Sequence, residues 1–231
     1  MVASNPAQSP TTATTKSRVL LIEDHPVVSR GLAMLIDDEH DLAVCGSAGS
    51  GPEALKLISQ LKPDVVILDI ALGDESGLDL IKRIHDILPN LPVLALSMHD
   101  ETLYAERALR AGAKGYIMKK EAMEKVMGAI RRVLDGEIFV SEKMASRMVH
   151  KLIDGGAASA AEGSPLELLS DREFEVFSLI AQGIGPSEIA NRLSVSVKTV
   201  ETHREHIKAK LGLRSAPELT RFALQWTMEQ R

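Results

Sequence analysis

The chain has 231 residues and a net charge of −5, with 45% hydrophobic and 26% charged residues, a composition typical of soluble proteins with one large or two ordinary domains. Its single cysteine, Cys45, excludes an internal disulfide and a cysteine cluster for a metal. No stretch approaches the roughly 20 apolar residues of a membrane span, and residues 1–17 lack the features of a signal peptide. We therefore expect a cytoplasmic protein with no membrane contact and a Ser-, Thr- and Pro-rich disordered tail at residues 1–17.

Short apolar runs alternate with helical patterns between residues 18 and 135. The runs are RVLLIE (18–23), LAVCGSA (42–48), DVVILD (64–69), PVLALS (92–97) and KGYIMK (114–119), and the helical patterns cover 26–37, 51–61, 76–88, 100–112 and 121–136. In the third pattern one apolar stripe contains Leu78, Ile81, Ile84, Ile87 and Leu88. Runs that are apolar throughout fit parallel strands covered on both faces, so the pattern predicts a doubly wound α/β domain with a five-stranded parallel sheet.

Helical patterns alone follow this region. Residues 141–153 (SEKMASRMVHKLI) continue as a helix, and the Gly-, Ala- and Ser-rich stretch 154–165 predicts a flexible linker. We therefore divide the chain into a disordered tail (1–17), an α/β domain (18–135), a linker helix with a flexible linker (136–165) and a helical domain (166–231).

Polar residues stand where four of the expected strands end. Glu23 and Asp24 follow the first strand, Asp69 ends the third, Ser97 ends the fourth and Lys119 follows the fifth. Because the carboxyl ends of parallel strands share one edge, three carboxylates converge there, and a hard cation such as Mg²⁺ would relieve their repulsion. A carboxylate beside Mg²⁺ and Lys can attack phosphorus and form an acyl phosphate, whose oxygens the ammonium and hydroxyl groups would hold.

Each of these residues alone has an ordinary explanation. An Asp after a strand usually starts a turn or caps a helix, a Ser often caps one, and Lys119 stands in a KKE sequence typical of a solvated helix start. It is the combination, on the correct strand ends and in the correct order, that favours phosphoryl chemistry centred on Asp69.

Residues 18–135 resemble the receiver domain of bacterial two-component response regulators, through LLIEDHP, VVILDIALGDESGLDLI, VLALSMHD and AGAKGYIMKK. The resemblance implies a flavodoxin-like fold in which Asp69 accepts a phosphoryl group from a sensor histidine kinase and Lys119 binds it. The implied Mg²⁺ ligands are Glu23 (through water in the family's pattern), Asp24, Asp69 and the main-chain carbonyl of Ala71. It further implies that Ser97 and Tyr116 move together as the switch.

Three positions depart from the common receiver pattern. Many receivers have Pro where Gly73 and Lys120 stand here. Ala71 offers no polar side chain toward a phosphoryl group, which leaves the lifetime of the phosphorylated form open. None of these departures removes a group that the expected chemistry requires.

The last 66 residues predict a helix-turn-helix. Ser170 or Asp171 caps a helix whose apolar face holds Phe174, Phe177, Leu179 and Ile180, glycines 183 and 185 end it, and Pro186 begins the next helix. Ser196 is the expected N-cap of a longer helix, with Val200, His203, Ile207 and Leu211 on one face. Residues 192–214 hold six basic side chains against two acidic ones, a local excess that permits nucleic-acid binding.

Residues 166–228 resemble the LuxR-type DNA-binding domain, an all-α four-helix fold, through SDRE, IAQGIGPSEIANRL, SVKTVETHREHIKAKL and APELTRFAL. The resemblance places the helix that starts near Val197 in the DNA major groove and implies dimerisation through the last helix, at about 215–227. The DNA-binding candidates are Lys198, Thr199, Glu201, Thr202, Arg204, Glu205, Lys208 and Lys210. The basic residues are expected at phosphates, and Glu201, Thr202 and Glu205 toward base edges.

Together the two resemblances indicate a response regulator of the NarL/FixJ type, a transcription factor controlled by phosphorylation. The expected partners are a sensor histidine kinase, double-stranded promoter DNA and, after phosphorylation, a second copy of the chain, with RNA polymerase as a further candidate. Phosphorylation would favour dimers or release the recognition helix from the receiver.

Three other hypotheses remain to be compared. The receiver could be a vestigial dimerisation module, although its acid set is intact. An aspartyl-phosphate phosphotransferase commonly has a second Asp where Ala71 stands, so we do not expect an enzyme. A flavin site would require phosphate to lie beside the carboxylates of Glu23 and Asp24.

Overall fold

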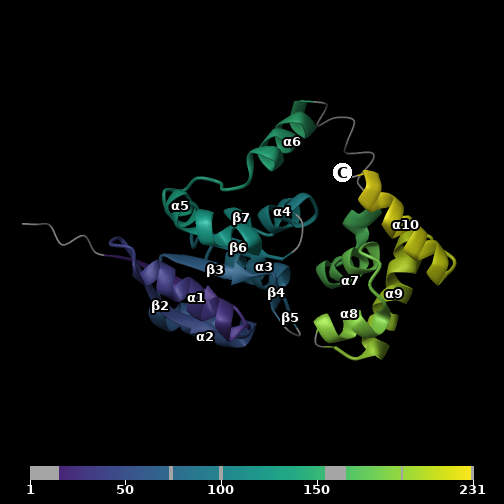
Figure 1. Ribbon diagram of the computed structural model, residues 1–231, viewed down its shortest axis with the longest axis horizontal. Coiled ribbons are helices and arrows are strands. Elements are labelled where there is room, and N and C mark those ends of the chain that lie inside the picture. Colours follow the sequence, from purple (N-terminus) through teal and green to yellow (C-terminus); the bar gives the residue numbers. More distant parts are fainter. Residues whose placement is uncertain (1–15, 73–74, 99–100, 154–164, 194, 230–231) are drawn as a thin grey trace, which may run out of the picture.

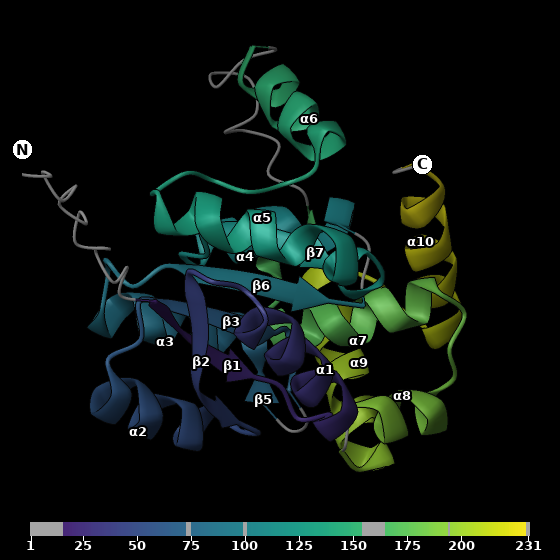
Figure 2. The same cartoon turned by 60° about the vertical axis from the view of Figure 1, so that its left-hand side comes forward.

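The computed structural model describes residues 16–72, 75–98, 101–153, 165–193 and 195–229. Most of the expected disordered tail and of the expected flexible linker lies outside these residues. The chain forms an α/β part and a group of C-terminal helices, and two views show these helices beyond the carboxyl ends of the strands (Figures 1 and 2). No helix in the described ranges is long and apolar enough to cross a membrane.

The α/β part is built on a parallel sheet, as the apolar runs predict. Its strands are β1 (Ser17–Ile22), β2 (Leu42–Ala48), β3 (Val65–Asp69), β6 (Val93–Ser97) and β7 (Gly115–Met118), in the order β2-β1-β3-β6-β7. Every residue of β3 and β6 is buried, because helices cover both faces of the sheet. The order reverses between β1 and β3, which makes the carboxyl edge of these two strands the expected ligand site of a doubly wound sheet.

Five helices cover this sheet. They are α1 (Pro26–Asp37), α2 (Gly51–Leu61), α3 (Gly77–Ile87), α4 (Glu101–Arg110) and α5 (Ala122–Leu134). The apolar residues of α1 and α5 pack with one face of the strands, through side chains such as Ile36, Ile67 and Ile130. Those of α2, α3 and α4 pack on the other face, and this second core continues into the C-terminal helices.

The apolar stripe expected on residues 76–88 is only partly buried. Leu78, Ile81 and Ile84 lie in the core, but 64% of Ile87 and 41% of Leu88 is exposed. The helix ends at Ile87, and Leu88 has left helical geometry, as expected for a residue that precedes a proline. The stripe prediction is therefore wrong for its last two members, which lie where the helix ends.

A short hairpin follows the strand that ends on Asp69. Strands β4 (Ala71–Leu72) and β5 (Glu75–Ser76) pair antiparallel, with Ala71 opposite Ser76. The sequence predicts a turn of Gly73, Asp74 and Glu75. Glu75 is in a strand instead, and the other two lie outside the described residues. A side chain at Gly77 would come within 2.5 Å of the Ile70 Cα, so this glycine allows the hairpin to return closely against the end of β3.

The chain after α5 returns to the edge of the sheet. Phe139 accepts a hydrogen bond from the Tyr116 N–H at 2.8 Å and donates one to the Lys114 carbonyl at 2.9 Å. This contact covers part of the otherwise open edge of β7. The sequence predicts a linker helix with a flexible linker over residues 136–165, and around Phe139 this segment pairs with the edge of the sheet. Helix α6 (Glu142–Ile153) follows as predicted.

The C-terminal part is helical, as the sequence predicts. It contains the 3₁₀ turn η2 (Pro165–Leu168), α7 (Asp171–Ala181), α8 (Pro186–Arg192), α9 (Val197–Leu211) and α10 (Ala216–Glu229). Ser170 closes a capping box with Glu173 at the start of α7, and the Ser196 side chain accepts from the Thr199 N–H at 3.0 Å at the start of α9. These caps confirm the expected helix starts, because each satisfies a main-chain donor that the first turn leaves unpaired.

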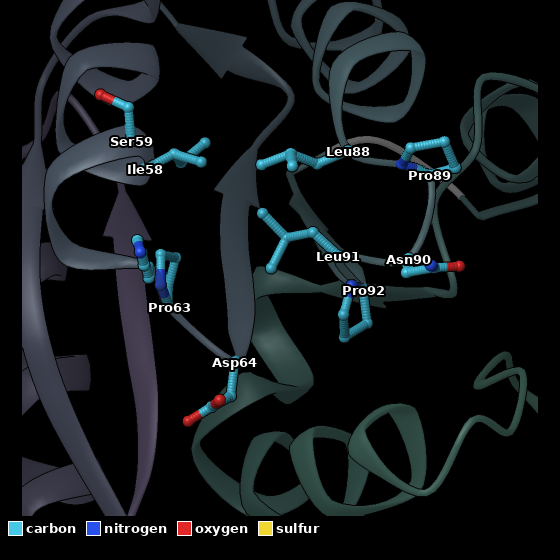
Figure 3. A pocket seen from close by; sticks show the side chains of 10 residues that line it. Ile58, Ser59, Pro63, Asp64, Leu88, Pro89, Asn90, Leu91 and Pro92 are labelled. Carbon is cyan, nitrogen blue, oxygen red and sulfur yellow. The ribbon is translucent and has the colours of Figure 1, made fainter.

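A pocket of about 530 Å³ lies at the opposite edge of the sheet, near the amino ends of β3 and β6 (Figure 3). Its lining comes from the end of α2 and from the α3–β6 loop, including Ile58, Leu88, Leu91 and Pro92. The pocket is therefore separate from the acidic edge where the sequence predicts the functional site.

Candidate phosphoryl-acceptor site and DNA-reading helix

Four side chains form an acidic cluster beyond the ends of β1 and β3. Glu23, Asp24, His25 and Asp69 each place one ligand atom within 4.8 Å of the others. Glu23 is 4% exposed and Asp69 is 1% exposed. The two strands are neighbours in the sheet, and both end at the same edge, so the three acids converge as predicted.

Lys119 supplies the positive charge of the site. Its Nζ lies 2.7 Å from Asp69 Oδ2 and 2.6 Å from Glu23 Oε2. Burial alone would lower the pKa of Lys119, but the neighbouring carboxylates of Asp69 and Glu23 raise it above its ordinary value. The ammonium group therefore stays charged and bridges the ends of β1 and β3 from the turn that follows β7.

Asp69 is a carboxyl held in an unfavourable place for a charge. Burial raises its pKa to about 6, against the opposing effect of Lys119, and the negative charge of Glu23 raises it further. The Ala71 N–H donates to Asp69 Oδ1 at 3.1 Å, which fixes the orientation of the carboxyl group. A divalent cation beside these oxygens would stabilise the ionised form that nucleophilic attack requires.

The expected switch residues lie on the next two strands, β6 and β7. Ser97 ends β6 and is fully buried, and Tyr116 in β7 is 1% exposed. In the sheet register Asp69 pairs with Leu96, so Ser97 stands one residue beyond it at the same edge. The sequence does not predict which rotamer Tyr116 adopts, and in the structure its ring lies inside the fold.

His25 is a member of the cluster that sequence reasoning missed. Its Nδ1 lies 2.7 Å from Asp24 Oδ1 and 3.1 Å from Glu23 Oε1, and two thirds of its side chain is exposed. The signal was present, because His25 directly follows the acidic pair in the sequence. The sequence pattern predicts a role as metal ligands for Glu23 and Asp24 and none for His25.

The donor set of this cluster fits Mg²⁺. Carboxylate oxygens are the ligands that this hard cation prefers, usually one or two together with water and phosphate oxygens. Glu23 Oε2 is buried and makes no hydrogen bond of good geometry in the described part of the chain, although Lys119 lies beside it. The converging carboxylates thus supply oxygen ligands that suit Mg²⁺, and a bound cation would reduce the repulsion between them.

The predicted DNA-reading helix, α9, is accessible in the intact chain. Val200 and Ile207 are buried against the other helices, whereas Lys198, Glu201, Thr202, Glu205 and Lys210 are exposed and Thr199, Arg204 and Lys208 are half-buried. Five of the eight candidates are therefore exposed in the intact chain, and the other three are partly covered.

Ion pairs hold most of the basic side chains of α9. Arg204 pairs with Glu201 at 2.9 Å, Lys208 with Glu205 at 2.9 Å, and Lys210 with Glu173 at 2.6 Å. Among the described residues, Lys198 is the candidate phosphate contact for which no ion pair is found. It is also the first of the four, in the first turn of the helix.

A contact joins the α/β part to the C-terminal helices through Arg107 of α4. This guanidinium donates to Asp171 Oδ1 at 2.9 Å and to the carbonyls of Leu166 and Leu169 at 2.5 and 3.3 Å. It also lies 3.9 Å above the centre of the Phe174 ring. Arg107 therefore binds the segment that starts α7.

Aromatic rings extend this contact. Tyr104 of α4 meets Phe174 edge-on with centroids 5.1 Å apart, and Phe174 meets Trp226 of α10 at 6.3 Å. Tyr104 is fully buried and belongs to the same core as Tyr116. The residues between the phosphoryl-acceptor edge and α7 are thus continuously packed.

Comparisons with known proteins agree with this arrangement. Residues 19–131 match the response regulator receiver domain, and residues 167–223 match the luxR family of bacterial regulatory proteins. The chain is 40% identical over 210 residues to the oxygen regulatory protein NreC of Staphylococcus aureus (strain MRSA252), which covers 90% of this chain and 97% of that protein.

Solved structures of response regulators are similar to this chain in part or over most of its length. A LuxR-family two-component response regulator from Aurantimonas sp. SI85-9A1 has a TM-score of 0.56 and 28% identity, over 60% of this chain and 99% of that one. RcsB from Salmonella typhimurium, in a study of conformational dynamism for DNA interaction, has a TM-score of 0.53 and 25% identity, over 90% and 97% of the two chains.

Receiver and LuxR-type domains in this order fit a DNA-binding regulator of transcription. The chain belongs to the response regulators of the NarL family.

Proposed function

We propose that this chain is a phosphorylation-dependent regulator of transcription whose Asp69 accepts a phosphoryl group from a sensor histidine kinase. The observation that carries this proposal is the setting of Asp69, which is buried at the strand edge with Lys119 Nζ at 2.7 Å and two further carboxylates close by. Few structural roles require three acids and one ammonium group at a single sheet edge.

In the proposed step an oxygen of ionised Asp69 forms a bond to phosphorus. The bond between phosphorus and the imidazole nitrogen of the kinase breaks, and the nitrogen keeps the electron pair of that bond. The product is an acyl phosphate on Asp69. Lys119 and the Ser97 hydroxyl would hold the phosphoryl oxygens as their charge develops.

Magnesium belongs to this proposal as the cofactor. Glu23, Asp24, Asp69 and the main-chain carbonyl of Ala71 would hold it, and when bound it neutralises phosphoryl oxygens and the crowded carboxylates. His25, which bonds to the acids on the solvent side, would orient Glu23 and Asp24 toward the ion.

The output of the regulator would be binding to double-stranded promoter DNA through α9. The supporting observations are the accessible polar face of this helix and the match of residues 167–223 to a DNA-binding family. RcsB, whose interaction with DNA has been studied structurally, shares the architecture. We propose that Lys198, Arg204, Lys208 and Lys210 contact phosphates, and that the ion pairs of the last three exchange partners on binding.

A second copy of the chain would bind along α10. This helix has a shallow hollow bordered by Leu224 and Met228, which are 44% and 77% exposed, and by Thr220 and Arg221. An exposed apolar row at helical spacing fits a self-complementary helix pair. Dimers would place two copies of α9 on adjacent half-sites. We keep RNA polymerase as a further candidate partner of this cytoplasmic complex.

The alternative hypotheses predict different chemistry. A vestigial receiver would keep the fold but accept no phosphoryl group. A phosphotransferase would need an acid/base group near Asp69, and Ala71 provides none. Both rivals therefore differ from our proposal in whether a stable phosphorylated protein forms.

The test is the intact mass of the protein after incubation with Mg²⁺ and acetyl phosphate, beside Asp69→Asn. We expect a gain of one phosphoryl group in the parent and none in the variant. Equal labelling of both proteins would contradict the assignment of Asp69. Absence of labelling by acetyl phosphate and by a histidine kinase, even with rapid quenching, would favour the vestigial receiver.

A further inference from the structure

Glu175 is a buried carboxyl at the contact between the two domains, and neither the phosphoryl chemistry nor DNA binding uses it. It lies on α7 beside Arg172, whose Nη1 donates to Glu175 Oε2 at 2.7 Å. Only 2% of Glu175 is exposed. Its other oxygen, Oε1, has no hydrogen-bond partner among the described residues, so half of this carboxyl group is removed from water without compensation.

Two residues of the receiver, Ser76 and Tyr104, lie close to the carboxyl group of Glu175. The Ser76 hydroxyl of β5 lies near Glu175 and favours its ionised form, yet this hydroxyl also lacks a hydrogen bond of good geometry in the described chain. Burial and then the nearby Glu175 raise the pKa of Tyr104 of α4 well above its ordinary value. Separation of the domains would remove both receiver residues and return Glu175 to water.

We propose that the contact between the receiver and the DNA-binding domain is a proton-controlled latch, in which Glu175 takes up a proton when the domains close and releases it when they open. A protonated carboxyl can donate a hydrogen bond to a hydroxyl such as that of Ser76, whereas an ionised one can only accept. The closed contact thus favours the neutral acid and the open state favours the carboxylate.

Other charged groups face this site and set its limits. Those on α7 are Asp171 and Arg172, and those on α4 are Tyr104 and Arg107. Asp79 of α3 and His203 of α9 act one step further out, through Asp171 and Arg172. Arg172 opposes protonation of Glu175, and Asp171 favours it. Arg107 bonds to Asp171 and so reduces that second effect. Burial nevertheless raises the pKa of Glu175 to about 7.

The direction of the pH dependence follows from these two states. The closed state binds the proton more tightly than the open state, in which Glu175 has its ordinary pKa of 4.5. Closure is therefore strongest below that value, and the proton's contribution is lost as the pH rises through about 7. Between pH 6 and pH 8 the equilibrium constant for closure should fall by about tenfold.

This latch is independent of phosphorylation at Asp69, and it would link domain opening to pH near neutrality. Glu175 lies on the DNA-binding domain, whereas the acidic cluster around Asp69 lies in the receiver. Closure leaves the polar face of α9 accessible. The latch would therefore act on the freedom of the two domains to pair with a second copy and with two half-sites, rather than by covering α9.

The test is small-angle X-ray scattering of the full-length, unphosphorylated protein at pH 6 and pH 8, at one ionic strength, with Glu175→Gln and Glu188→Gln. The amide of Glu175→Gln resembles the neutral acid, and Glu188 is an exposed acid of the same domain that pairs with Arg192 at 3.0 Å. We expect the parent and Glu188→Gln to expand at pH 8, and Glu175→Gln to stay compact at both values. An unchanged size of the parent, or the same expansion in Glu175→Gln, would overturn the latch.

A second measurement covers the case in which Glu175→Gln does not fold. Hydrogen exchange of the parent, corrected for the intrinsic rate, should show protection of α4 and α7 falling with a midpoint near pH 7 while α1 stays unchanged. Absence of such a midpoint would also overturn the proposal. Both measurements are repeated in Asp69→Asn. A persisting pH response there supports the latch whatever the result of the phosphorylation test, and its loss there would show that Asp69 rather than Glu175 controls the contact.

Discussion

Asp69 and Glu175 are both buried carboxyl groups that face a cation, and burial raises the pKa of both, to about 6 and about 7. Their surroundings differ. Asp69 lies at a strand edge with other carboxylates, and its cation, Lys119, is shared with Glu23. Glu175 lies on a helix under the neighbouring domain, with Arg172 as its cation.

The same cost of burying a carboxyl group can therefore serve two purposes. At Asp69 several oxygens converge on one point, so a cation or a phosphoryl group can relieve the charge that burial has made costly. At Glu175 no such ligand set exists among the described residues, and the available relief is a proton or exposure to water. The function of each carboxyl group therefore depends on which ligand can bind it, a cation or phosphoryl group at Asp69 and a proton at Glu175, rather than on burial alone.

The largest effect is expected on removing the cation from the first site. Lys119→Met leaves Asp69 and Glu23 buried without their shared partner, which should destabilise the receiver by about 3 kcal/mol at pH 8. At pH 5 the loss should be smaller, because protonation of Asp69 then removes part of the repulsion. Urea denaturation at both pH values measures it, and intact mass should show loss of phosphorylation.

Lys125→Met provides the control for that experiment. Lys125 is half exposed and pairs at the surface with Glu121, at 3.0 Å, so its loss should cost well under 1 kcal/mol. If Lys119→Met were as stable as this control at pH 8, the ammonium group would not be what compensates the buried acids.

A smaller effect is expected on removing Arg107 from the contact between the two domains. Arg107→Ala deletes charge-assisted hydrogen bonds to Asp171 and to two carbonyls and should weaken domain closure by about 2 kcal/mol. Scattering at pH 6 should then show an expanded protein. Arg110→Ala is the matched control, because Arg110 lies on the same helix and pairs at the surface with Glu106. Compact Arg107→Ala protein would exclude Arg107 as the main bond of the contact.

The first site was predictable from sequence, and the second was not. Apolar runs that end on acids, on a serine and on a lysine specify both a parallel sheet and the groups at its edge, because the carboxyl ends of parallel strands coincide. Likewise Ser170, Pro186 and Ser196 mark the helix starts of the C-terminal domain by local rules.

No local rule relates Arg107 to Asp171, which are 64 residues apart, or brings Ser76 near Glu175. The same limit applies to Phe139, whose pairing with the edge of β7 depends on how the chain returns after α5. Ile87 shows a related limit, because it belongs to the predicted apolar face of the helix and is nevertheless exposed. A helical pattern identifies an apolar face but not the point at which the sheet beneath the helix ends.

A smaller effect than that of Arg107→Ala is expected from a change on α9. This change should weaken DNA binding without affecting Asp69 or Glu175. Lys198→Ala removes one expected phosphate contact, which should weaken binding to all DNA sequences and reduce the salt slope by about 1. Fluorescence anisotropy over a series of salt concentrations measures this slope, and Lys125→Ala controls for net charge. Unchanged affinity at matched salt would remove Lys198 from the interface, while phosphorylation of Asp69 should be unaffected in any case.

The smallest effect concerns an acid whose pH dependence has the opposite sign. Hydrogen bonding to Arg131 lowers the pKa of Asp41 to about 2, although burial opposes this, and the two atoms Arg131 Nε and Asp41 Oδ2 are 2.8 Å apart. Such an acid stabilises the fold above its ordinary pKa of 3.8, and this contribution is lost as the pH falls toward 2.

Asp41→Asn should therefore cost about 1 kcal/mol at pH 7, a value reduced for the partial exposure of the pair, and less at pH 3. Urea denaturation at the two pH values measures this difference. Glu175→Gln should instead change domain closure mainly above pH 7, since its proton is already bound below that value. An equal cost of Asp41→Asn at both pH values would mean that the pair with Arg131 acts through packing rather than charge. Asp41 would then no longer be a surface acid that its partner keeps ionised, in contrast to Glu175, a buried acid that domain closure protonates.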